Sequence, residues 1–183
     1  MKMLALPQDA ISSIVHQIAG SIIDQLRKTR TIGDYFPTLF IVHADQGGQL
    51  EIVSMTRESL GEDLPARQMT LFSAGTALGM AKDHQVVMVL LGYMGWGVFS
   101  PTPEEAQRMP SESPRREEIV TLASLTVDRK QSLSIIRLDR DPDGVLLPLY
   151  VEYLSETIKG ANLEDNLLPF FFEGYFGQGA EIQ

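Results

Sequence analysis

The strongest constraint on the fold is a run of apolar residues near the middle of the chain. Residues 85–93 are almost unbroken in apolar side chains and rich in valine. Such a run is typical of a β-strand that is buried on both faces near the centre of a sheet. Its longest purely apolar stretch, residues 86–91, is far too short to span a membrane. We therefore expect a layered domain in which this strand is central.

Apolar periodicity predicts two main helices, one before the first two strands in the sequence and one after them. From Ala10 to near Gly33 apolar residues fall three or four apart, which places them on one stripe of a helix. A second helix is expected over residues 66–82. Gly75 and Gly79 lie four residues apart in it and make a flat face. That face suits close helix packing, either inside the monomer or across a dimer.

The remaining pattern predicts strands joined mostly by hairpins. The expected strands span residues 38–43, 49–55, 85–93, 118–127, 132–139 and 145–153. Gly47, Gly48 and the Pro-Asp-Gly sequence at 142–144 mark two of the turns. We therefore expect an α+β fold with two main helices and a mostly antiparallel sheet of about five to six strands. The order of elements resembles that of the roadblock and profilin-like group, in which a central sheet carries helices.

The chain length fits a single domain with a C-terminal extension. With 183 residues, of which 44% are hydrophobic, the chain can bury a core without disulfides or a structural metal. We expect one α+β domain over residues 1–153 and an acidic, aromatic extension over residues 154–183. The extension contains Phe170, Phe171, Phe172, Tyr175 and Phe176. Such aromatic surface needs burial, so we expect the extension to pack on the domain or on a partner subunit.

Charge and cysteine content exclude several classes of function. The formal net charge of −9 repels phosphate backbones and anionic lipid, so we expect neither nucleic acid nor membrane as a partner. The absence of cysteine removes disulfides, thiol nucleophiles and thiolate metal ligands. The apolar stretch before Pro7 is too short for the core of a signal peptide. We therefore expect a cytoplasmic protein of bacterial type.

One acidic loop matches part of a calcium-binding pattern. Asp139, Asp141, Asp143 and Gly144 occupy the first, third, fifth and sixth positions of an EF-hand-type loop, and carboxylates are ligands that calcium prefers. The twelfth position is Tyr150 instead of a bidentate glutamate, and the flanking residues favour strands over helices. Two hypotheses remain open, a calcium-stabilised module and a hairpin turn. We favour the turn and expect no cofactor.

A second candidate site follows the central strand. Trp96, the only tryptophan, lies in a glycine-rich stretch where ligand sites often open. Further along, Arg115 and Arg116 could hold an anionic ligand while Glu112 serves as a base. The structural alternative is a surface connection whose charges pair with one another, with Trp96 covering the end of the core. No spacing in this region identifies a reaction.

The same region carries a resemblance to other proteins. Residues 110–118 read Pro-Ser-Glu-Ser-Pro-Arg-Arg-Glu-Glu. This segment resembles a Pro-Ser-Glu-x-Pro-x-Arg-x-Glu stretch that uncharacterised bacterial proteins carry before their closing strands, sometimes with a tryptophan upstream, where Trp96 stands here. The resemblance covers about residues 93–150 and implies no function.

No sequence signature of catalysis is present. The chain lacks a dinucleotide fingerprint, a phosphate-binding loop and a Gly-x-Ser-x-Gly elbow, and its three histidines lack metal-ligand spacing. We therefore favour a non-catalytic cytoplasmic interaction or homo-oligomeric domain. The alternative is a small-molecule-binding domain or enzyme with its site near Trp96, Glu112, Arg115 and Arg116. A calcium-stabilised module with Asp139, Asp141 and Asp143 as ligands is third.

Overall fold

The central strand is the longest element of the sheet. The structure, a computed structural model, describes residues 6–28, 38–56, 63–81, 85–99, 102–104, 107, 109–143, 146–154 and 167–177. The predicted central strand is β3 (Gln85–Gly97), and its residues 86–92 are all buried. It runs four residues beyond the expected end at residue 93, because it pairs with a neighbouring strand as far as Gly97. Trp96 therefore lies on a strand and not in a loop.

One antiparallel sheet organises the described residues. Its six strands lie in the order β2-β1-β3-β4-β5-β6, and every neighbouring pair is antiparallel. The strands beside β3 are β1 (Thr38–Ala44), β2 (Leu50–Thr56), β4 (Glu117–Thr126), β5 (Gln131–Arg140) and β6 (Leu146–Leu154). This arrangement confirms the expected α+β class with a sheet of about five to six strands.

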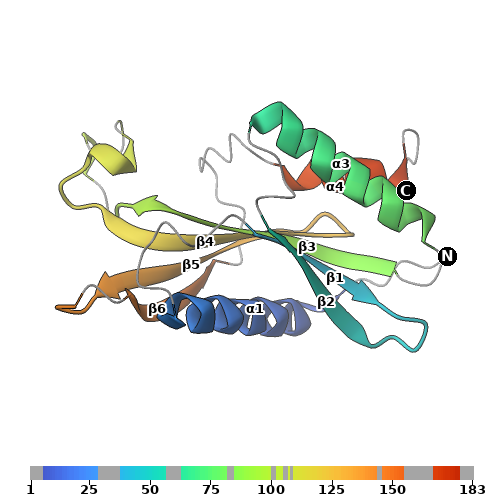
Figure 1. Cartoon of the computed structure of the whole chain (residues 1–183), viewed down its shortest axis with the longest axis horizontal. Helices are drawn as coiled ribbons and strands as arrows, with labels where there is room; N and C mark the ends of the chain where they lie inside the picture. The colour runs from blue at the N-terminus through green and yellow to red at the C-terminus, as the bar shows by residue number, and fades with distance from the viewer. Residues whose placement is uncertain are drawn as a thin grey trace.

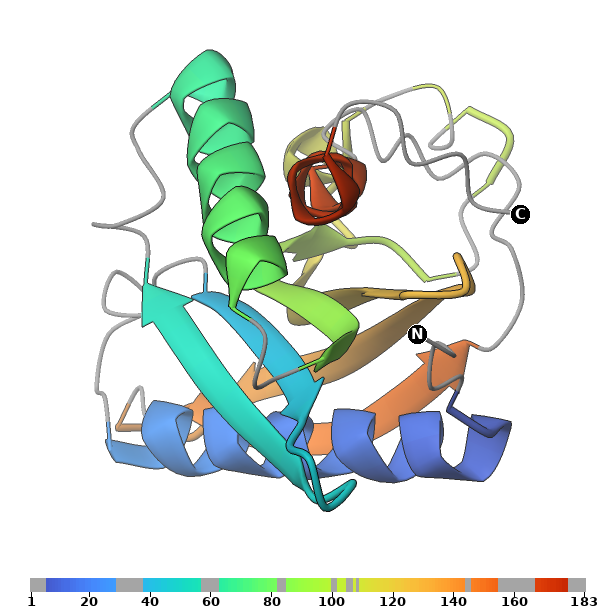
Figure 2. The ribbon, with the colours of Figure 1, turned by 90° about the vertical axis from the view of Figure 1, so that its right-hand side faces the viewer.

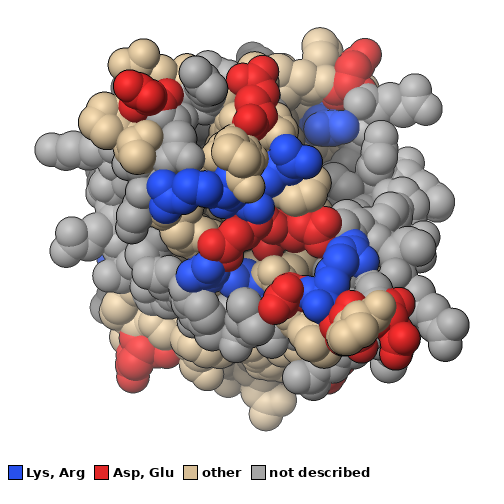
Figure 3. Space-filling view, turned by 90° about the vertical axis from the view of Figure 1, so that its left-hand side faces the viewer, with Lys and Arg blue, Asp and Glu red and all other residues tan. Residues whose placement is uncertain are grey.

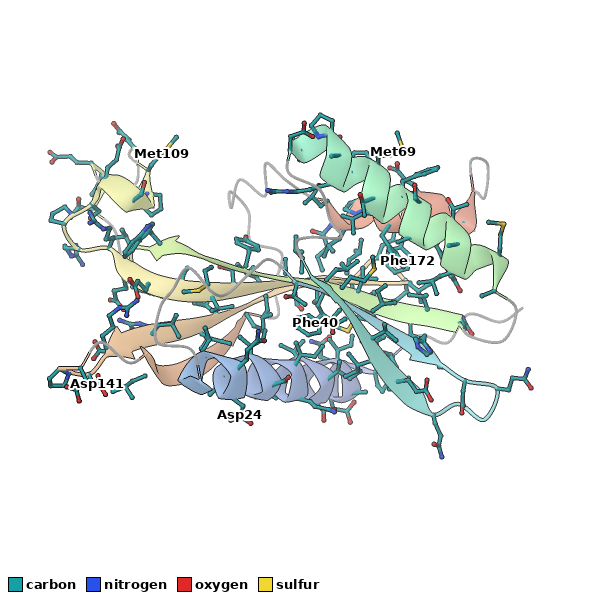
Figure 4. The ribbon with its side chains drawn as sticks, in the orientation of Figure 1. Asp24, Phe40, Met69, Met109, Asp141 and Phe172 are labelled. Atoms are coloured by element: carbon teal, nitrogen blue, oxygen red, sulfur yellow. The ribbon has the colours of Figure 1, made fainter. Side chains whose placement is uncertain are left out.

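Helices cover both faces of the sheet (Figure 1). The first helix, α1 (Gln8–Lys28), lies on one face, and its apolar stripe is buried as its periodicity predicts. The expected continuation of this helix toward Gly33 lies outside the described residues. On the other face lie α3 (Leu64–Met80) and α4 (Leu168–Phe176). Figure 4 shows Phe40 on the α1 side of the sheet and Phe172 on the α4 side, where each belongs to a buried apolar cluster.

The second main helix begins slightly earlier than its periodicity predicts. Asp63 caps it, since its Oδ1 accepts a hydrogen bond from Ala66 N at 2.8 Å, and a proline follows in the first turn. The helix ends at Met80, two residues before the expected end, and residue 82 lies outside the described residues. Among the described helices, none is both long and apolar enough to cross a membrane.

Glycines bring α3 and α4 into backbone contact. A Cβ added at Gly75 would lie under 3.0 Å from the carbonyl oxygen of Phe171, and one at Gly79 would meet that of Tyr175 equally closely. The relation is reciprocal, because a Cβ at Gly174 of α4 would meet the carbonyl oxygen of Phe72. The flat face that the sequence predicts therefore packs α3 against α4 of the same chain (Figure 2).

The aromatic residues of α4 belong to one apolar cluster with residues of α3 and of the sheet. Phe171 is fully buried, and Phe172 and Tyr175 stack on it edge-on and face-on, respectively. The hydroxyl of Tyr175 accepts a hydrogen bond from Val86 N at 3.1 Å, which connects α4 to the beginning of the central strand. The expected boundary between domain and extension, near residue 153, remains a prediction.

Candidate functional site

The end of the sheet beyond residue 93 of β3 carries an exposed aromatic ring under an arginine. Trp96 pairs with Glu118 of β4 in the strand register, and 41% of its surface is exposed. The guanidinium carbon of Arg116 lies 4.9 Å from the centre of the Trp96 ring, within the range of a cation–π contact. Arg116 Nη1 also donates a hydrogen bond to the carbonyl of Ser111 at 3.1 Å. The arginine is thus fixed over the ring.

A short helical turn ties this segment to the end of β3. The turn is the 3₁₀ helix η3 (Pro110–Glu112), and it is followed by the buried Ser113, whose hydroxyl accepts a hydrogen bond from Arg115 N at 3.1 Å. Arg115 Nη2 donates to the carbonyl of Phe99 at 3.3 Å. Arg116 is therefore held against Trp96 of the central strand, and Arg115 against Phe99, which follows it.

Two ion pairs join β4 and β5 at the same end of the sheet, one on each face. Arg137 donates through Nε to Glu117 Oε2 at 2.7 Å, and its guanidinium carbon lies 4.2 Å from the centre of the Phe99 ring. Arg140 Nε lies 3.2 Å from Glu118 Oε2. Both pairs follow from the β4–β5 register, in which Ile119 faces Arg137.

These residues gather at one end of the sheet, where the neighbouring residues Glu117 and Glu118 of β4 lie on opposite faces. We call it the Trp–Arg end, and it consists of Trp96, Phe99, Arg115, Arg116, Glu117, Glu118, Arg137 and Arg140. Figure 3 looks onto this end and shows acidic side chains between basic ones. Each arginine of the surface lies against a carboxylate, an aromatic face or a backbone carbonyl. The Trp–Arg end is therefore an ordered, mixed-charge region with an exposed tryptophan.

The structure places the four residues predicted for this site on β3, on η3 and in the segment that leads into β4. Trp96, Arg115 and Arg116 gather at the Trp–Arg end, and Glu112 lies exposed on η3 next to Ser111, whose carbonyl accepts a hydrogen bond from Arg116. The carboxylates that pair with arginines here are those of Glu117 and Glu118.

Sequence reasoning missed Arg137 and Arg140. A signal for them existed, because the short turn after β4 fixes the hairpin register and so brings Arg137 beside Glu117.

The acidic loop forms a hairpin turn between β5 and β6. Asp141 Oδ1 accepts a hydrogen bond from Asp143 N at 2.9 Å, and Asp139 Oδ1 accepts one from Arg140 N at 2.8 Å. These are the local contacts of turn chemistry. Gly144 lies outside the described residues. Within the described part of the chain, no group of three candidate ligands is placed to hold a metal ion. The calcium hypothesis remains a prediction.

A small pocket lies elsewhere, between α4 and the turn that joins β4 to β5. Its volume is about 80 Å³, and Phe172, Phe176 and Arg129 contribute to its lining. Sites for drug-sized ligands usually measure about 300–1,000 Å³. This pocket therefore gives no support to a small-molecule site.

The chain was compared with protein-family models, with curated proteins and with solved structures, and none of them matches it.

Proposed function

We propose that this chain is a non-catalytic, cytoplasmic protein-interaction domain that contacts its partner through the Trp–Arg end. The observation that carries the proposal is the exposed Trp96 ring with the Arg116 guanidinium held 4.9 Å above its centre. Tryptophan and arginine are enriched among the residues that contribute most to protein–protein binding. An exposed pair of these two, already ordered, is therefore a suitable anchor for a partner.

Preorganisation favours a protein contact. Arg137 and Arg140 are held by Glu117 and Glu118, so they lose little side-chain freedom when a partner binds. The same pairing disfavours a small anionic substrate, which would have to compete with the carboxylates for the arginines. A protein surface can instead add contacts around these pairs and leave them intact.

The charges indicate the chemistry of the partner surface. Arg116 covers one part of the Trp96 ring, which leaves the rest for an apolar side chain. Arg115 and Arg116 are both exposed, so either guanidinium can meet a carboxylate on the partner. We expect a partner segment with an apolar residue close to an acidic one. Its affinity should fall as salt rises.

Affinity capture with matched variants tests the proposal. Wild type, Trp96→Ala and Arg116→Ala are used to capture proteins from an extract of the native cells. Met69→Ala serves as the control, because Met69 is exposed on α3, away from the Trp–Arg end (Figure 4). We expect a protein that wild type and Met69→Ala retain and that both site variants retain at least about tenfold less, a loss typical of a contributing interface residue.

Two results would contradict the proposal. One is the same set of captured proteins with all four forms of the chain. The other is a small metabolite or nucleotide that raises the melting temperature of wild type but not of Trp96→Ala, which would support the small-molecule alternative.

A further inference from the structure

The two edges of the sheet are built differently. At one edge, β6 carries Pro148, and its register with β5 shifts between Arg137 and Leu138. Proline and irregular register are features that block the addition of another strand. At the other edge, β2 pairs with β1 over seven residues without interruption. Its sequence, Leu50–Thr56, contains neither proline nor lysine. The edge at β2 therefore lacks these protections (Figure 2).

The hydrogen-bond pattern shows which backbone groups of β2 point outward. Asp45 N donates to Gln49 O at 2.9 Å, so these residues form a hydrogen-bonded pair in the hairpin. Every second residue pair repeats this geometry, which directs the amides of Glu51, Val53 and Met55 toward β1. The intervening residues, Leu50, Ile52, Ser54 and Thr56, therefore direct their N–H and C=O groups away from β1. Among the described residues, no strand pairs with these groups.

The side chains of this edge are suited to a neutral, apolar contact. Val53 is 48% exposed and Leu50 is 40% exposed, although both lie on a strand of the sheet. Glu51 is the only ionisable residue in Leu50–Thr56, and its carboxylate lies 3.9 Å from Nε2 of His43. The edge is thus almost free of charge in a chain whose net charge is −9.

We propose that β2 pairs antiparallel with β2 of a second copy of this chain, about a twofold axis at Val53. In that register Ile52 faces Ser54 of the second copy, and Leu50 faces its Thr56, so all four outward-facing residues of each strand form hydrogen-bonded pairs. On the axis, Val53 faces Val53 of the second copy as a non-hydrogen-bonded pair, in which the two side chains lie close together.

The charge pattern of β2 favours this register and a second copy of the chain as the partner. Glu51 faces Met55 of the second copy, so no two acids oppose each other across the axis. Moving the axis to Ile52 would place Glu51 against Val53 and leave Thr56 without a partner. The strand is therefore complementary to itself, which a strand from an unrelated protein need not be. The inference extends the proposed function, since it adds a second contact surface remote from the Trp–Arg end, but either can fail alone.

Sedimentation of the full chain over a range of concentrations tests the pairing. We expect wild type to approach twice the 20.3 kDa chain mass at tens of micromolar. Val53→Lys places two like charges face to face on the axis and should weaken the dimer by at least about tenfold. Val53→Thr keeps a β-branched, neutral side chain and serves as the matched control that remains dimeric.

A backbone variant gives a second test. Ser54→Pro removes an outward-facing N–H that β1 does not use, so the hairpin should still fold while the dimer is lost. Ser54→Ala keeps that N–H and should remain dimeric. A monomeric wild type, or a dimer that persists in both Val53→Lys and Ser54→Pro, would overturn the inference. Trp96→Ala should still dimerise, which separates this test from that of the proposed function.

Discussion

Asp128 illustrates how single side chains hold a turn that has no glycine. Its Oδ1 accepts a hydrogen bond from Thr126 Oγ1 at 2.5 Å, and Lys130 Nζ lies 2.8 Å from its other oxygen. Burial raises the pKa of Asp128, but the hydrogen bonds from Lys130 and Thr126 outweigh it and hold the pKa below its ordinary value of 3.8. Arg129 beside it has a φ of 63°, a conformation that glycine adopts more easily. The charged form of Asp128 therefore stabilises the turn.

Asp128→Asn tests this contribution. Because the pKa of Asp128 is lower in the folded protein than in the unfolded one, its contribution is present above pH 3.8 and is lost as the pH falls toward the folded pKa. We expect the variant to lose about 0.5–1 kcal/mol of unfolding free energy at neutral pH. Urea unfolding at a series of pH values measures the difference. A loss that stays the same at the lowest pH would argue against this account.

At the scale of elements, the tight contact between α3 and α4 depends on glycine. Gly75, Gly79 and Gly174 each lie where an added Cβ would collide with a backbone carbonyl of the facing helix. Backbone atoms cannot move aside as the end of a flexible side chain can. The two helices would therefore have to separate, and the buried Phe171 and Phe172 between α4 and the sheet would lose contacts.

Gly75→Ala should therefore destabilise the fold, by about 1–3 kcal/mol, as overpacked core sites do. Gly20→Ala is the matched control, because Gly20 lies in α1 and an added Cβ there meets no atom within 4 Å. The control should gain about 0.5–1 kcal/mol from higher helix propensity. Chemical unfolding of both variants measures the two values. Equal effects of the two substitutions would show that α3 and α4 are not packed as described.

Periodicity predicts most elements of this fold, because apolar stripes and alternation record which side of an element is buried. The end of β3 is the clearest exception. Gly92, Gly95 and Gly97 suggest an irregular segment, but pairing with β4 extends the strand to Gly97. Strand length here is set by pairing with residues at least 20 positions away in the sequence, which the local sequence pattern does not record. The spacing of Gly75 and Gly79 in the sequence also does not distinguish packing inside the monomer from packing across a dimer.

At the scale of the whole molecule, helices on both faces of the sheet leave its ends and edges as the places where a partner can reach the strands (Figure 1). The Trp–Arg end lies at one extremity, near Met109 and Asp141 (Figure 4). The sequence predicts a site at Trp96, Glu112, Arg115 and Arg116, because the tryptophan lies in a glycine-rich stretch after the central strand and the arginines lie beside carboxylates. It missed Arg137 and Arg140, which only strand pairing brings there.

Quenching of Trp96 fluorescence by acrylamide tests the central claim most directly, because Trp96 is the only tryptophan. The claim is that this ring is exposed and available to a partner, while self-association uses β2. We predict substantial quenching of the native protein that does not change between dilute and concentrated samples. A shielded ring with little quenching would contradict the proposed interaction surface. Quenching that falls as protein concentration rises would instead show that two copies meet at the Trp–Arg end.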